Sequence, residues 1–121
     1  MCLPSMPRVG ILCLFLVLGL EGCAKETPSY PLDQELARAS VQKAMQAWVD
    51  GKSPQDLKPE IIVGDRSWEQ GEKLLSFEIL KDEETSDGSN LHIRVVQKFE
   101  SSESTTTYIT GTSPVITIFP Q

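Results

Sequence analysis

The sequence predicts an α+β domain in which one long N-terminal helix packs on a four- to five-stranded antiparallel meander sheet, preceded by a signal peptide. Three observations indicate this: an apolar run near the N-terminus, one segment with apolar residues at helical spacing, and several short alternating segments separated by turn residues. A chain of 121 residues has room for one such domain. We therefore expect a signal peptide over residues 1–22, a tether over 23–31 and a single α+β domain over 32–121.

Residues 1–22 have the composition of an export signal. Arg8 is the one positively charged side chain there, and it precedes an apolar run from Val9 to Leu20. A membrane-spanning helix needs roughly 20 apolar residues. This run is shorter and is typical of the hydrophobic region of a signal peptide. The sequence thus predicts that the protein is exported.

The end of this segment, Leu20-Glu21-Gly22-Cys23, resembles the lipobox of bacterial lipoproteins. That family has a Leu three residues before the Cys and a small residue directly before it. Leu20, Gly22 and Cys23 match, whereas Glu21 stands where small or apolar residues are usual. The resemblance implies cleavage before Cys23, acylation of Cys23 and anchoring in the lipid bilayer. Within the family, Ala24 in place of an Asp after the Cys implies release to the outer membrane, on its periplasmic side.

A second processing route is consistent with the same residues. Gly22 and Ala24 form a small-residue pair, and cleavage by ordinary signal peptidase after Ala24 would release a secreted soluble protein. Both routes remove Cys2 and Cys13, and they leave Cys23 either acylated or discarded. The mature domain is therefore predicted to have no free thiol, which excludes a disulfide framework, a cysteine zinc site and a thiol nucleophile.

The segment from Asp33 to Asp50 is predicted to be the long helix. Asp33 is suited to cap its N-terminus, and Gly51 accepts the left-handed conformation that ends many helices. A second helix of one or two turns is expected between Ser53-Pro54 and Lys58-Pro59. The long helix carries a stripe of apolar residues that we expect to fill the concave face of the sheet: Ala37, Val41, Ala44, Met45 and Trp48.

Strand patterns follow Pro59. The segment 72–80 is expected to place Leu75, Phe77 and Ile79 on one face, and the segment 91–100 alternates with Leu91, Ile93 and Val95 on one face. Short connections, such as the polar loop with the Asp87-Gly88 turn, favour antiparallel hairpins over parallel crossovers. The expected strands are 60–63, 72–80, 91–100, 105–110 and 115–119.

One helix over a curved sheet resembles the architecture of the cystatin-like and nuclear-transport-factor-like α+β domains. Three stretches, 48–54, 61–65 and 111–118, also resemble small uncharacterised bacterial lipoproteins of a planctomycete type. That likeness covers roughly residues 40–119. It implies a fold and no activity.

The sequence offers few residues for catalysis or metal binding. Its one histidine, His92, lies in a predicted strand on the face opposite Leu91, and no Gly-x-Ser-x-Gly elbow or Gly-rich phosphate loop is present. The acidic loop 82–90 fails the EF-hand pattern, because aligning Gly88 with the loop glycine puts Arg94 at the bidentate ligand position; weak calcium binding is the alternative. We expect no catalytic, cofactor-binding or metal residues. A net charge of −6 argues against a nucleic-acid partner.

Two aromatic residues are candidates for a partner surface. Trp68 lies in a polar stretch and Tyr108 in a Thr-rich strand. Exposed on one sheet face, they could bind a protein. In the alternative, Trp68 covers one end of the core and Tyr108 packs against a neighbouring strand.

The expected function is therefore a small membrane-anchored lipoprotein that acts as a non-catalytic interaction or accessory module in the periplasm. Its partners would be the lipid bilayer, through acylated Cys23, and an unknown protein. The alternative is a ligand-binding or enzymatic domain with a pocket between helix and sheet. A protease inhibitor is a third hypothesis, by architectural analogy alone.

Overall fold

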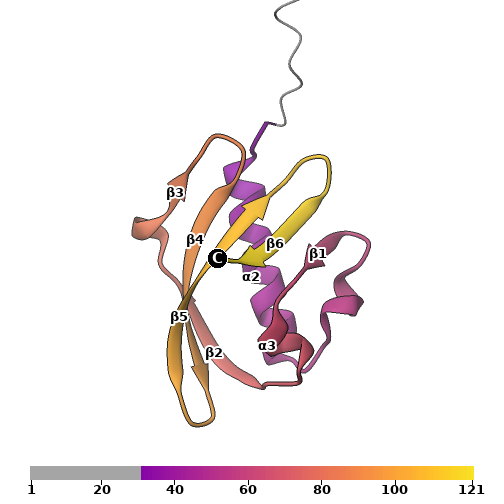
Figure 1. Ribbon diagram of the computed structural model, residues 1–121, viewed down its shortest axis with the longest axis vertical. Helices are drawn as coiled ribbons and strands as arrows, with labels where there is room; N and C mark the ends of the chain where they lie inside the picture. Colours follow the sequence, from indigo (N-terminus) through magenta and orange to yellow (C-terminus); the bar gives the residue numbers. More distant parts are fainter. Residues whose placement is uncertain (1–30) are drawn as a thin grey trace, which may run out of the picture.

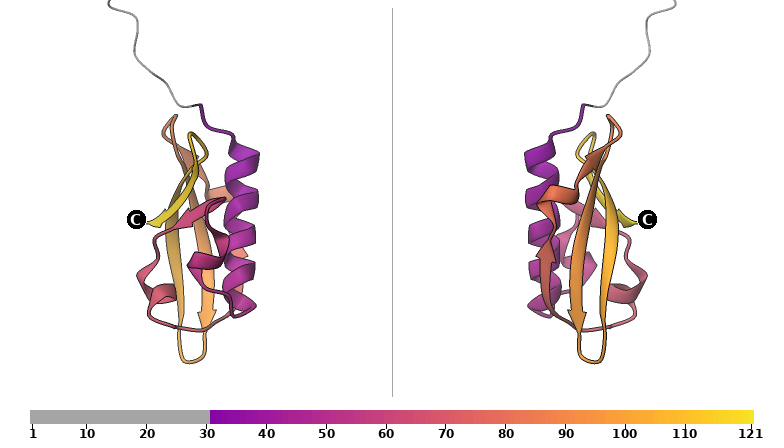
Figure 2. Two further views of the ribbon diagram at one scale, coloured as in Figure 1. Left: turned by 90° about the vertical axis from the view of Figure 1, so that its right-hand side faces the viewer. Right: turned by 90° about the vertical axis from the view of Figure 1, so that its left-hand side faces the viewer.

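The computed structural model describes residues 31–121, which form two layers: a helix and a curled sheet (Figures 1 and 2). The expected α+β class is confirmed. The signal peptide, the cleavage site and Cys23 lie outside the described residues. The helices are α2 (Gln34–Val49), η1 (Pro54–Leu57), α3 (Arg66–Glu69) and η2 (Lys81–Glu83). The strands are β1 (Ile61–Val63), β2 (Leu74–Ile79), β3 (Thr85–Ser86), β4 (Leu91–Phe99), β5 (Glu103–Gly111) and β6 (Ile116–Pro120).

Helix α2 forms where its caps and apolar stripe predict it. The Asp33 carboxylate accepts a hydrogen bond from the Leu36 N–H at 3.0 Å, and Gly51 has φ +85° just after the helix. The short helix η1 follows with a capping interaction, in which the Ser53 N–H donates to the Asp56 carboxylate. The predicted stripe of α2 is buried against the sheet: Ala37, Val41, Ala44, Met45 and Trp48.

The sheet order is β1-β6-β5-β4-β2, with the two-residue β3 paired to β4 beyond the end of β2. The β2, β4, β5 and β6 pairings are antiparallel, as expected. The expectation of an entirely antiparallel sheet was wrong, because β1 pairs with β6 in parallel, with Ile61 opposite Ile116 and Val63 opposite Ile118. The two strands are joined through the whole meander, so no short hairpin constrains their relative direction.

The face of β2 also differs from expectation. Leu75 was predicted to share one face with Phe77 and Ile79, which are partly buried, but it is 45% exposed, and its neighbour Leu74 is fully buried. The pairing of β2 with β4 shifts between Leu74 and Ser76, as at a β-bulge. A bulge breaks the strict alternation of a strand, and this reverses the side of Leu74 relative to the rest of β2.

The core lies between α2 and the inner face of the sheet. Leu91, Ile93 and Val95 face it, as the alternation predicts, and Phe99 extends the same row. The turn of helix α3 was not predicted. It forms because the Asp65 carboxylate caps the backbone N–H groups of Ser67 and Trp68.

Candidate functional site

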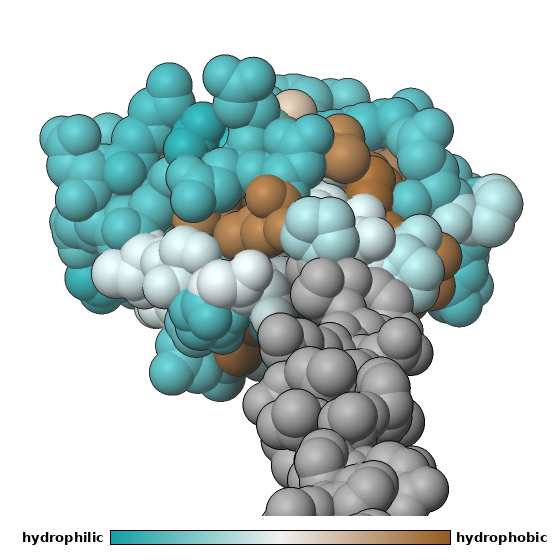
Figure 3. Space-filling model, turned by 90° about the horizontal axis from the view of Figure 1, so that it is seen from above, coloured by the Kyte–Doolittle hydropathy of each residue, from teal (hydrophilic) through white to brown (hydrophobic). Residues whose placement is uncertain are grey.

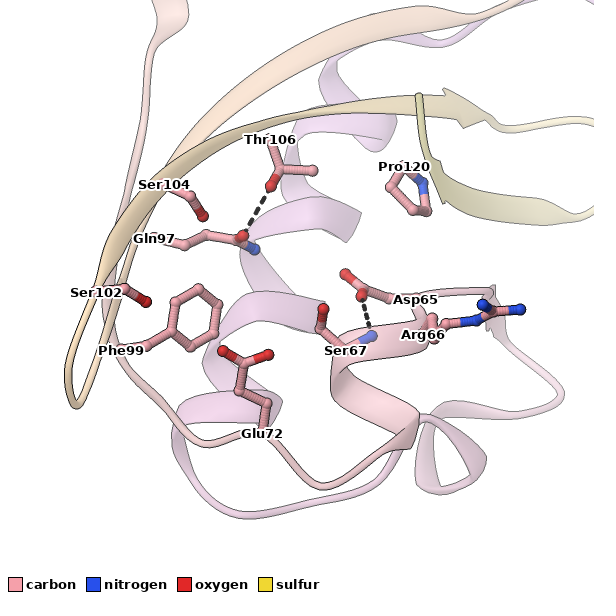
Figure 4. Close-up of a pocket in the computed structure, with 10 residues that line it drawn as sticks. All are labelled: Asp65, Arg66, Ser67, Glu72, Gln97, Phe99, Ser102, Ser104, Thr106 and Pro120. Atoms are coloured by element: carbon pink, nitrogen blue, oxygen red, sulfur yellow. Dashed lines mark hydrogen bonds between the residues drawn. The ribbon is translucent and has the colours of Figure 1, made fainter.

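A polar hollow of 240 Å³ opens between α3, the segment before β2 and the β4–β5 hairpin (Figure 4). Asp65 and Ser67 border it on the α3 side, and Glu72 borders it from the segment that leads into β2. The opposite wall comes from the hairpin: Gln97, Phe99, Ser102, Ser104 and Thr106. It is smaller than a drug-sized pocket, which occupies about 300–1,000 Å³.

Asp65 is held rigidly at this hollow. Its side chain is 5% exposed, and one oxygen, Oδ1, accepts hydrogen bonds from the N–H groups of Ser67 at 3.1 Å and Trp68 at 3.5 Å. The other oxygen accepts from the hydroxyl of Tyr108. The Asp65 carboxylate therefore accepts from three donors, two backbone N–H groups and one hydroxyl.

Gln97 extends this network under the hollow. Its side-chain amide donates to the Tyr108 oxygen at 2.7 Å, and its carbonyl accepts from the Thr106 hydroxyl at 2.9 Å. Gln97 is buried, so these bonds satisfy a polar group that would otherwise be costly inside the core. Burial raises the pKa of Tyr108 far above its ordinary value, and the hydrogen bond to Asp65 adds to the effect.

Trp68 and Tyr108, the candidates for a partner surface, are 4% and 0% exposed. Trp68 and Tyr108 therefore do not form an exposed partner surface; they are buried, as in the alternative. The Trp68 ring stacks on Trp48 with centroids 5.1 Å apart, and its ring N–H donates to the Lys52 carbonyl at 2.8 Å. The indole of Trp48 likewise donates to the Glu72 carbonyl at 2.6 Å. This pair fastens α3 and the start of β2 to the end of helix α2.

A second surface feature is the α2–β2 groove, made of two adjoining hollows of 480 and 390 Å³ that share Gln42 and Ile79. Strand β2 is an edge of the sheet and pairs, among residues 31–121, with β4 alone. The groove borders this edge with apolar side chains, namely the exposed Leu75 and the partly buried Phe77 and Ile79. Polar side chains of α2, Gln42 and Gln46 among them, line the other side of the groove. An open edge beside a groove of this mixed character can receive an extended peptide.

The carboxylates of the acidic loop, which includes residues 82–90, pair with basic side chains of the protein itself. Glu84 forms a two-point ion pair with Arg38, with both distances 2.7 Å, and Glu83 pairs with Arg94 at 2.5 Å. Asp87 accepts hydrogen bonds from the N–H groups of Asn90 and Ser89, and it contacts His92 at 3.0 Å. These bonds, that of Asn90 foremost, lower the pKa of Asp87 to about 2. Within the described residues, no group of three or more His, Cys, Asp or Glu is arranged to hold a metal ion.

The lipidation candidate, Cys23, lies outside the described residues. The described chain enters the domain at Leu32 and Asp33, where the Asp33 N–H donates to the Thr112 hydroxyl in the β5–β6 connection at 3.0 Å. From residue 31 onward, no helix is both long enough and apolar enough to cross a membrane.

Sequence reasoning missed Asp65 and Gln97. Gln97 had a usable signal, because it continues the inward alternation of Leu91, Ile93 and Val95 and was therefore due to be buried. Asp65 had a weaker signal: an Asp at this position can cap the N-terminus of a helix that starts with the next residue. Their meeting with Tyr108 depends on long-range packing that local patterns do not encode.

Comparisons with protein-family models, curated proteins and solved structures give no match to this chain.

Proposed function

We propose that the protein is an exported, non-catalytic interaction module that is held at the outer membrane, on the periplasmic side, by lipid on Cys23. The export signal and the Leu20-Glu21-Gly22-Cys23 motif support this proposal. Processing after Ala24 to a secreted soluble protein is the competing route.

The observation that carries the proposal is the exposed apolar surface at the N-terminal end of the domain, where the chain enters it. The start of α2 and the β5–β6 connection lie together at this end (Figure 1), joined by the Asp33–Thr112 hydrogen bond. Two of the exposed large apolar residues, Leu36 and Val115, belong to these two segments. Viewed onto this end, the surface carries apolar residues among polar ones (Figure 3). A short tether from Cys23 would turn this end toward the bilayer.

The surface charge at this end does not favour binding to a membrane, so the proposal assigns the anchoring to the lipid on Cys23. Asp33 and Glu35 are both exposed and acidic, so this end offers no attraction to anionic headgroups. A single acyl chain gives marginal, reversible binding, and stable anchoring takes a second signal. Lipoprotein processing, which attaches more than one chain to the Cys, would supply it.

The α2–β2 groove is the surface proposed for the protein partner. Its occupant would be an extended segment of that partner, which adds a strand to the edge of β2 and places alternate apolar side chains beside Phe77 and Ile79. A photo-crosslinker at Leu75 should then form a protein adduct in native membranes. The same probe at Phe119, which is similarly exposed on β6 and separated from β2 by two strands, is the matched control. Equal labelling at both sites would count against the groove.

The alternative, a ligand or enzyme pocket between helix and sheet, has less support. The helix residues that would line such a pocket, Val41, Ala44 and Trp48, are buried in the core. The protease-inhibitor hypothesis has no added support from the described surface.

Lipid labelling tests the anchor. In a bacterium with lipoprotein processing, the full-length protein should incorporate labelled palmitate, and Cys23→Ser should not. Incorporation by Cys23→Ser, or none by the wild type, would refute anchoring through Cys23. Cys13→Ser is the matched control, because it removes a leader thiol and should leave labelling unchanged.

A further inference from the structure

We draw no further inference here: the strongest candidate, the α2–β2 groove beside the open edge of β2, belongs to the surface already proposed for the protein partner, and nothing in the described part of the chain shows the chemistry of the segment that would cover it.

Discussion

The hydroxyl oxygen of Thr110 is buried and has no hydrogen-bond partner among the described residues. An unsatisfied buried hydroxyl costs about 1–3 kcal/mol. Replacement by the similarly shaped valine should therefore raise the free energy of unfolding, by about 1 kcal/mol. Urea unfolding of Thr110→Val measures this change.

Thr106 provides the matched comparison, because its hydroxyl donates to Gln97 at 2.9 Å. Thr106→Val should lower the free energy of unfolding by about 1 kcal/mol. If both variants lose stability equally, the Thr110 hydroxyl has a partner and the packing described for β5 is wrong.

Tyr108 couples stability to alkaline pH. Its pKa is raised in the folded state, whereas the unfolded chain has the ordinary value of about 10. Below that pH both states keep the proton and the full stability is present. As pH rises above it, the unfolded state loses the proton first, so stability falls with pH. Tyr30 is the other tyrosine of the sequence. In a Tyr30→Phe background, the phenolate absorbance of Tyr108 should therefore appear together with unfolding.

Tyr108→Phe should remove this alkaline slope. It should also lower stability at neutral pH by about 1–3 kcal/mol, because Asp65 loses a donor. Phenolate formation in a chain that is still folded would contradict the buried position of Tyr108.

At the scale of an element, the bulge in β2 makes two adjacent leucines unequal. Leu74→Ala should cost about 2–5 kcal/mol, as for a buried leucine, whereas Leu75→Ala should cost under about 0.5 kcal/mol. Alternation without the bulge predicts the reverse order. Chemical unfolding of the two variants therefore shows directly which leucine faces the core.

The elements that local chemistry determines could be predicted. Asp33, the α2 stripe and Gly51 define the helix, and the alternation from Leu91 defines the inner row of β4. The bulge at Leu74 could not be predicted, because it depends on pairing with β4. The parallel pairing of β1 with β6 also depends on contacts between segments far apart in the chain.

The candidate site was less accessible to prediction than the fold. Trp68 and Tyr108 were recognised as residues of interest, but whether each was buried depended on tertiary packing. Tyr108 meets Asp65 across 43 residues of sequence, and Gln97 meets Met45 across 52. Such contacts leave no local pattern, so the network behind the polar hollow emerges only in the folded chain.

At the scale of the whole molecule, the two ends of the domain differ in chemistry. Exposed Leu36 and Val115 belong to the start of α2 and to the β5–β6 connection, which lie at one end of the domain (Figure 1). The polar hollow lies between α3 and the β4–β5 hairpin, toward the other end. A domain tethered at the first end would present the second away from the bilayer. The α2–β2 groove runs along its side.

The mature N-terminus tests the central claim most directly. Mass spectrometry of the protein purified from native membranes should show a first residue of Cys23 carrying a diacylglyceryl group and an acyl chain. A soluble protein whose first residue is Lys25, or a chain that retains the leader, would contradict anchoring through Cys23.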